Sequence, residues 1–172
     1  MLGTLDWTPA TDRTDLLAPP TAAAVAAVPG AFAAPIDPEL ADTAAFCAEY
    51  DVPLAASANC VIVAAKRAGE VRYAACLVLA TDRADVNGVI RRELDARKVS
   101  FAPMADATTL TSMEYGGITP IGLPATWPIL VDAAIPDTPE VVIGSGLRRS
   151  KILLPGKSLL TLPNAQPLAL TL

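Results

Sequence analysis

The sequence predicts an α+β protein that folds as a single domain around a mixed, mostly antiparallel sheet. Its 172 residues suffice for one domain with a sizeable core. Short apolar segments typical of strands alternate irregularly with segments of helical periodicity, and no internal repeat is visible. Two apolar segments, 60–65 and 71–80, flank the short turn segment 66–70, a pattern typical of an antiparallel hairpin.

The N-terminal part divides into two segments of different character. Residues 1–36 are rich in Ala, Pro and Thr and lack a sustained period, which predicts a loosely structured arm preceding the domain at 37–172. A helix is expected over 37–49, because Asp37 is a typical cap and Pro38 suits the first helical position. Its inward-facing residues are expected to be Leu40, Ala44, Phe46 and Cys47.

The remaining elements follow the hairpin. Residues 85–95 form an amphipathic pattern with Val86, Val89, Ile90 and Leu94 on one face, capped by Thr81 or Asp82. The tail 167–172 is an apolar edge strand that either pairs with a second copy or closes the sheet. Between these lie a strand at 98–101, a helix at 106–113 capped by Asp106, and strands at 127–132, 140–143, 150–154 and from 165 onward.

Composition restricts the kinds of partner. A net charge of −5 and a pI near 4.6 argue against binding nucleic acid through a broad basic surface, so any RNA contact must be local. Solvated surface is the ordinary interpretation of the basic clusters available for it, Lys66–Arg67, Arg91–Arg92 with Arg97–Lys98, and Arg148–Arg149 with Lys151.

Cysteine and hydropathy patterns limit metal and membrane binding. Cys47, Cys60 and Cys76 are widely spaced and no histidine is present, so we expect free buried thiols, no metal and no cofactor. The longest apolar stretch, 22–34, is interrupted by Pro and Gly and is too short to span a bilayer. The first residues lack the basic segment of a secretory signal, so a cytoplasmic location and no membrane partner are expected.

Three glycines and one proline crowd into residues 114–122, Glu-Tyr-Gly-Gly-Ile-Thr-Pro-Ile-Gly. Such a segment is either an ordinary turn or a rigid loop that presents bare backbone N–H groups to a ligand. In the second interpretation, successive amides of Gly117, Ile118 and Thr119 converge on one oxygen, and Thr119 adds its hydroxyl. The absence of histidine favours this kind of chemistry, because it excludes every mechanism that needs an imidazole base.

The residues from Val52 onward resemble the YbaK/EbsC family, which includes the editing domain inserted in bacterial prolyl-tRNA synthetases and free-standing proteins that deacylate mischarged tRNA. The resemblance is carried by Val52-Pro53-Leu54, the paired strands that follow, and Gly116-x-x-x-Pro120 followed by Gly122. It implies a curved sheet flanked by helices and a trans-editing deacylase that hydrolyses the aminoacyl ester through backbone amides and groups of the substrate. It also implies that the tRNA acceptor end is a binding partner and that an aminoacyl-tRNA synthetase is a second partner. A homodimer and a monomer both remain open.

The resemblance also assigns residues. It places Gly116, Gly117, Thr119 and Pro120 in the catalytic loop, and it implies substrate contacts from Asn59, Cys60, Ile118, Gly122, Asp132, Gly144, Ser145 and Gly146. Several of these have ordinary structural interpretations: Asp132 as a turn cap, the 144–146 segment as a tight turn, and Cys60 as a small core residue. Many relatives carry a lysine where this chain has Asn59, so a catalytically reduced module that binds an aminoacyl, nucleotide or protein ligand is the alternative function.

Overall fold

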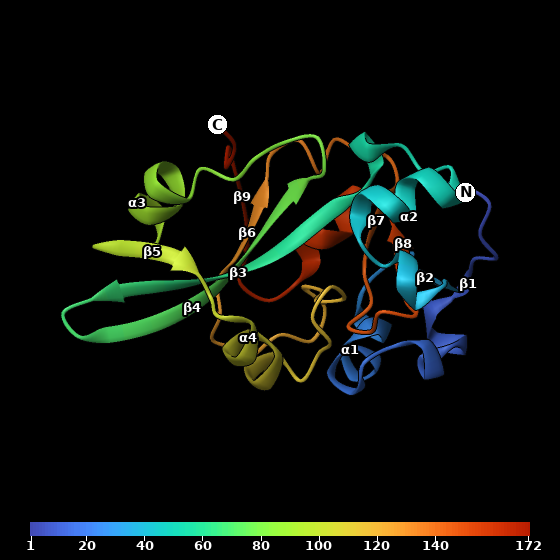
Figure 1. The fold of residues 1–172 in the computed structure, drawn as a ribbon, viewed down its shortest axis with the longest axis horizontal. Coiled ribbons are helices and arrows are strands. Elements are labelled where there is room, and N and C mark those ends of the chain that lie inside the picture. The colour runs from blue at the N-terminus through green and yellow to red at the C-terminus, as the bar shows by residue number, and fades with distance from the viewer.

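The computed structural model describes residues 1–172, and it arranges them as a single α+β domain with two sheets (Figure 1). The smaller sheet has the order β1-β2-β8-β7 and is antiparallel throughout. Its strands are β1 (Thr8–Pro9), β2 (Phe32–Pro35), β7 (Val141–Gly144) and β8 (Ser150–Leu154). The mixed α+β class predicted from the sequence is therefore confirmed, although the strands form two sheets rather than one.

The larger sheet has the order β5-β3-β4-β6-β9 and contains the predicted hairpin. The hairpin strands and β5 pair antiparallel, whereas β6 and β9 add to the other edge in parallel. The C-terminal tail therefore closes this sheet within the same chain. The strands are β3 (Ala58–Arg67), β4 (Glu70–Leu79), β5 (Lys98–Phe101), β6 (Ile129–Asp132) and β9 (Ala165–Leu168).

The two sheets meet where β3 begins. A parallel bridge between Ser57 and Val142 joins the residue before β3 to β7 and so connects the two sheets at this point. The hairpin extends away from this junction to one end of the molecule, and β1 and β2 lie toward the other end (Figure 1). The main core fills the space beside the junction, where Ile62 and Leu77 of the larger sheet pack with Ile143 and Ile152 of the smaller one.

Few helices accompany the sheets. They are α1 (Pro19–Ala24), α2 (Thr43–Tyr50), α3 (Arg91–Glu93), which extends a π-helical turn at Val86–Ile90, and α4 (Met104–Thr111). The expected helix from residue 37 is interrupted: Asp37 caps a separate 3₁₀ turn, Pro38–Leu40, and α2 starts only at Thr43. None of the helices has the length and apolar character needed to cross a bilayer.

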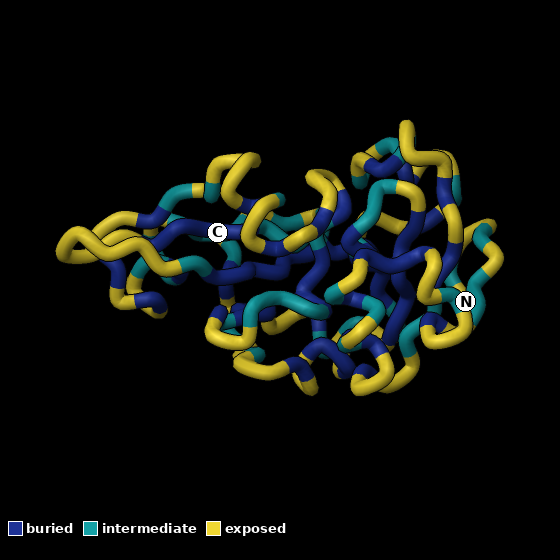
Figure 2. Tube along the Cα trace, turned by 90° about the horizontal axis from the view of Figure 1, so that it is seen from below, coloured by how far each residue is buried: buried dark blue, intermediate teal, exposed yellow.

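Residues 1–36 pack into the domain, which corrects the expectation of a loosely structured arm. Strand β2 pairs with β8 over four residues, and α1 lies beneath the sheets. Leu16, Leu17 and Val25 are buried in the main core with only 2–4% of their surface exposed. Figure 2 shows the same contrast along the chain, with a buried centre and exposed residues concentrated at the hairpin tip and in loops. The packing of residues 1–36 could not be predicted from the sequence, because 3₁₀ turns of three residues produce no periodic pattern of apolar residues.

Asp85, rather than the expected Thr81 or Asp82, caps the segment that ends in α3. Its carboxylate accepts hydrogen bonds from the amides of Gly88 and Val89, both at 3.1 Å. The apolar face predicted for this segment is confirmed, because Ile90 and Leu94 are buried in a second core cluster.

We predict that Asp85→Ala lowers the free energy of unfolding by about 1 kcal/mol, because it leaves two amides at the helix start without their acceptor. Asp82→Ala is the matched control, since the Asp82 carboxylate accepts no hydrogen bond in the protein and its removal should change the unfolding free energy by a few tenths of a kcal/mol at most. Urea unfolding of both variants measures the difference. Equal losses would contradict the assigned cap.

Candidate functional site

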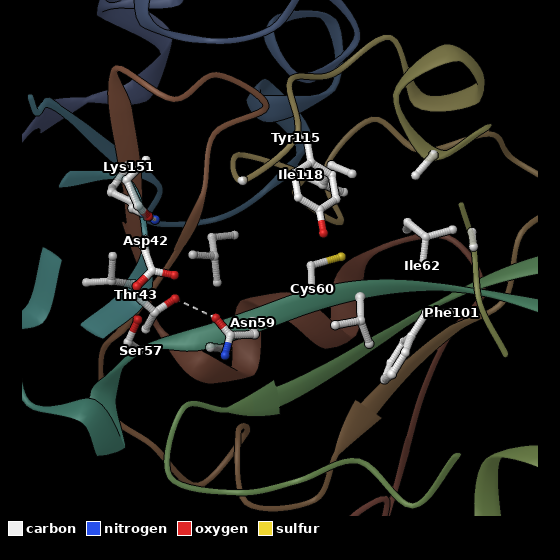
Figure 3. A pocket seen from close by; sticks show the side chains of 18 residues that line it. Asp42, Thr43, Ser57, Asn59, Cys60, Ile62, Phe101, Tyr115, Ile118 and Lys151 are labelled. Atoms are coloured by element: carbon white, nitrogen blue, oxygen red, sulfur yellow. Dashed lines mark hydrogen bonds between the residues drawn. The ribbon is translucent and has the colours of Figure 1, made fainter. Parts of the chain in front are cut away.

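A cavity of about 520 Å³ opens at the junction of the two sheets (Figure 3). The first residues of β3 form its floor, and residues of β7 and β8, the start of α2, α4 and the glycine-rich loop surround it. Two-thirds of the lining residues are hydrophobic, which is typical of a site that binds a small organic group. The lining residues that carry the argument are Asp42, Asn59, Cys60, Gly116, Ile118 and Lys151.

The glycine-rich loop presents two of its residues to this cavity. Gly116 and Ile118 both line it, and neither of their amide N–H groups has a hydrogen-bond acceptor within the protein. Gly116 has a φ of +87°, a conformation that other residues rarely adopt, and the Arg148 guanidinium fills the space where a Cβ would be. The loop therefore has two amides available for a ligand oxygen.

The other two amides expected at this oxygen are engaged elsewhere, which corrects the predicted arrangement. The Gly117 amide donates to the Glu114 carbonyl at 3.0 Å, and the Thr119 amide donates to the Met113 sulfur at 3.5 Å. Thr119 is fully buried outside the cavity lining, and its hydroxyl has no hydrogen-bond partner. The Gly117 bond closes the turn at 114–117, so that this amide points back to its own turn.

The 144–146 segment supports the loop instead of lining the cavity. The Gly146 amide donates to the Gly117 carbonyl at 2.6 Å, and the Glu114 amide donates to the Gly146 carbonyl at 2.9 Å. Gly144 lies so close that a Cβ there would be 2.5 Å from the Gly117 oxygen. Ser145 is buried, and its hydroxyl bonds to Ser150 at 2.6 Å. These contacts hold the loop in one conformation.

Arg148 braces the same loop from outside. Its guanidinium donates to the Tyr115 carbonyl at 3.2 Å and to the Pro38 carbonyl at 3.0 Å, and its backbone N–H donates to the Glu114 carboxylate at 2.8 Å. Arg148 does not line the cavity, so its role here is to position the loop.

Lys151 on β8 is the one cationic side chain in the cavity lining. It is 7% exposed, its ammonium donates to the Ala41 carbonyl at 3.1 Å, and it lies 5.1 Å from the centre of the Phe46 ring. Burial lowers the pKa of this ammonium below its ordinary value, whereas the neighbouring Cys47 and Asp42 act in the opposite direction. An ammonium carries three N–H donors, so the bond to Ala41 leaves others for a ligand.

Asp42 is the one acidic side chain in the lining, and it lies on the same side of the cavity as Lys151 (Figure 3). It occupies the position before α2, where an aspartate usually accepts a hydrogen bond from the helix amides, yet its carboxylate makes no such bond. The cavity thus has a polar side with one positive and one negative group, and an apolar side at Ile62 (Figure 3).

Asn59 and Cys60, from which the resemblance implies substrate contacts, both line the cavity floor. The Asn59 side-chain oxygen accepts a hydrogen bond from the Thr43 hydroxyl at 2.7 Å. The Cys60 sulfur points into the cavity (Figure 3), but burial raises the pKa of its thiol far above the ordinary value, and the Cys76 thiol raises it further. Cys60 therefore remains a neutral thiol near pH 7 and contributes surface, not a nucleophile.

The remaining predicted residues lie away from this cavity. Asp132 is 4% exposed at the end of β6, where its carboxylate accepts hydrogen bonds from the amides of Ala134 at 3.1 Å and Leu170 at 2.9 Å. It caps the turn and joins it to the C-terminal tail, which corrects its expected role at a substrate amine. Pro120 and Gly122 line a separate apolar cavity of about 230 Å³.

Sequence reasoning missed several residues of the site, namely Asp42, Thr43, Ser57, Phe101 and Tyr115. Phe101 and Tyr115 are 63% and 54% exposed, which is unusual for large apolar side chains and marks the rim of the cavity. A signal for Tyr115 was available, because it adjoins the glycine pair. Asp42 offered none, since an aspartate before a helix is ordinarily a cap.

Comparison with known proteins identifies the family. The model of the aminoacyl-tRNA editing domain matches residues 37–162, so the chain belongs to that family. Among proteins of curated function, none matches the sequence significantly.

Solved structures share the fold at low sequence identity. One, described as a proposed trans-editing enzyme for prolyl-tRNA synthetase, is 19% identical with a TM-score of 0.77, and the match covers 91% of this chain and 99% of that one. A second, a hypothetical protein, is 20% identical with a TM-score of 0.68 over 80% of this chain and 86% of its own. At these identities the likeness shows the fold alone, and it confirms the predicted YbaK-like architecture.

We predict that Asp132→Ala lowers the free energy of unfolding by about 1–3 kcal/mol, because it leaves two amides without their acceptor, one of them the buried amide of Leu170. The exposed Asp137 provides the control, and Asp137→Ala should be nearly neutral. Denaturant unfolding of both variants measures the effect. An Asp132→Ala protein that keeps its stability but binds ligand less well would contradict the capping role and assign Asp132 to the binding site.

Proposed function

We propose that this protein hydrolyses the ester bond of mischarged aminoacyl-tRNA in trans, in the cytoplasm, with the tRNA acceptor end as its substrate and an aminoacyl-tRNA synthetase as its functional partner. Membership of the aminoacyl-tRNA editing family supports the substrate class. The single observation that carries the proposal is the cavity, where two unengaged amides, one ammonium and one carboxylate surround a space of about 520 Å³.

These groups complement an aminoacyl ester. Such an ester carries an α-ammonium two bonds from its carbonyl carbon, so it needs an anion and a set of hydrogen-bond donors close together. Asp42 supplies the carboxylate for the α-ammonium, and the amides of Gly116 and Ile118 supply donors for the carbonyl oxygen. Lys151 adds positive charge to the same side of the cavity, where negative charge develops as the carbonyl is attacked (Figure 3).

The reaction needs no protein base of the imidazole type. In the proposed step, the oxygen of a water molecule bonds to the carbonyl carbon and the bond from that carbon to the ribose oxygen breaks. The water's proton passes to the departing ribose oxygen through the adjacent ribose hydroxyl, so the products are the free amino acid and uncharged tRNA. The protein's part is to hold the ester in position and to stabilise the developing oxyanion.

The alternative of a reduced binding module rests on the absence of a lysine at position 59 and on the acidic pI of the chain. Lys151 supplies a cation to the same cavity from a different strand, so the substitution at Asn59 does not leave the site without positive charge. This observation favours an active hydrolase over a catalytically reduced binding module.

We predict that the purified protein releases the amino acid from at least one mischarged tRNA carrying cysteine, alanine or serine. Ester loss is followed with radiolabelled amino acid and compared with the rate in buffer. The Gly117→Val variant serves as control, because a Cβ at this position would lie 2.6 Å from the Leu147 carbonyl oxygen and displace the loop. Binding of the charged tRNA without any release would favour the binding module instead.

We predict that Lys151→Met lowers kcat/KM for ester hydrolysis by about 100-fold or more, since it removes the cation nearest the developing charge. Met has a similar volume and avoids a buried ammonium, so thermal stability should be unchanged or higher. Adding Asn59→Lys to this variant returns a cation to the cavity floor and should restore part of the activity. Lys157→Met, at an exposed position, is the matched control. Unchanged activity in Lys151→Met would remove Lys151 from the mechanism.

A further inference from the structure

Two lysines face each other at the far end of the hairpin. Lys66 of β3 and Lys98 of β5 are direct partners in the antiparallel register, and both are exposed. Neither forms an ion pair; the two ion pairs of the protein join Arg13 to Asp15 and Arg67 to Asp95. Like charges directly opposite each other destabilise a sheet, so this pair has no benefit for folding.

The lysine pair lies on the face of the sheet that forms the cavity floor. Side chains alternate along a strand, so Lys66 shares a face with Ile62 and Cys60, both of which line the cavity. Val63 and Ala65 occupy the opposite face, where they pack in the core cluster that contains Ile90 of the α3 segment. Four residues separate Ile62 from Lys66, a distance of about 13 Å along an extended strand.

Strand β5 connects the same two places. It begins at Lys98 and ends at Phe101, which lines the cavity and is 63% exposed at its rim. Tyr115, 54% exposed, lines the cavity from the loop. The side chain of Phe101 itself lies on the other face of the sheet, since Phe101 is the register partner of Val63. On the cavity face, exposed cationic side chains at the hairpin are therefore followed by the exposed aromatic ring of Tyr115 at the cavity.

The charge of the molecule is unevenly distributed. Residues 66–98 carry eight Lys or Arg and five Asp or Glu, whereas the rest of the chain carries five basic and thirteen acidic side chains. An acidic protein that concentrates its positive charge in one segment can attract a polyanion to that segment and repel it elsewhere. Lys66–Arg67 and Arg97–Lys98 adjoin each other in the structure, since the Arg97 amide donates to the Lys66 carbonyl at 2.9 Å.

We propose that Lys66 and Lys98 bind backbone phosphates of the tRNA acceptor end and direct its 3′ terminus past Tyr115 into the cavity. This inference rests on the proposed function and names the surface that recognises its substrate. Lysines contact phosphates without regard to sequence, and an exposed aromatic ring such as that of Tyr115 stacks on an unpaired base, which together suit a single-stranded terminus beside a helical stem. An acidic protein partner would use the lysines but would not need the Tyr115 ring.

The test compares two double variants of equal net charge. Lys66→Gln with Lys98→Gln removes the proposed phosphate contacts. Arg92→Gln with Lys157→Gln removes two exposed charges away from the cavity face, Arg92 lying in α3 on the other side of the sheet. The probe is an RNA minihelix that contains the acceptor stem and its CCA end and carries no amino acid. It is titrated at several salt concentrations.

The expected result is a Kd for the minihelix that rises at least about tenfold in the lysine variant and stays near the wild-type value in the control. The slope of log Kd against log salt concentration should fall by about 1.4, corresponding to two lost phosphate contacts on a single strand. Equal binding by the two double variants, or no binding of the minihelix by the wild-type protein, would overturn the inference.

Aminoacyl-adenosine, which lacks the phosphates, separates this inference from the proposed function. The lysine variant should hydrolyse it at the wild-type rate, and a matching loss with this small substrate would overturn the assignment of the lysines to phosphate. Lysine-dependent binding of the minihelix without hydrolysis of any ester would support the RNA surface and contradict the deacylase. Hydrolysis of the ester, together with minihelix binding that does not depend on the lysines, would support the deacylase and contradict the RNA surface.

Discussion

The site depends on two backbone hydrogen bonds between the glycine-rich loop and the turn at 144–146. Gly117 and Gly146 are joined by one, and Glu114 and Gly146 by the other, at a separation that a Cβ on Gly144 or Gly117 would prevent. Because the loop is fixed against the smaller sheet and its neighbours Gly116 and Ile118 line the cavity, their unengaged amides need no rearrangement when a ligand arrives. Preorganisation of this kind is what electrostatic stabilisation of an oxyanion requires.

The junction of the two sheets explains where the cavity lies. Ser57 and Val142, which form the bridge between the sheets, both line the cavity, and the other residues around it come from segments far apart in the sequence. Lys151 reaches this space from β8 and Asp42 reaches it from the start of α2. Lys151 is buried in a largely apolar surrounding, where its interaction with a ligand is stronger than in water, whereas Asp42 is exposed at the cavity. A protein without histidine can in this way assemble an ester-binding site from amides and two charged groups.

Local sequence patterns predicted where most strands and the glycine-rich loop lie. They did not predict which segments contact one another across the fold. The hairpin, β5, the α3 segment and the later strands occur where periodicity placed them, because each has a local pattern. The packing of residues 1–36 was missed, since their three-residue 3₁₀ turns and the six-residue helix α1 are too short to show such a pattern. Within the loop, of the three amides expected to converge on a ligand oxygen only that of Ile118 is unengaged, because Gly117 donates to Glu114 within the same turn. The capping role of Asp132 and the approach of Lys151 depend on segments 38 and 110 residues away, which spacing along the chain cannot reveal.

The central claim is that the amides of Gly116 and Ile118 hold the ester carbonyl inside this cavity. A crystal structure with an aminoacyl-adenosine analogue, its ester replaced by a stable amide, tests that claim directly. The account predicts the analogue's carbonyl oxygen at about 2.7–3.2 Å from at least one of the two amide nitrogens, with its α-ammonium toward Asp42. A complex in which the carbonyl lies outside the cavity, with both amides still free, would contradict it.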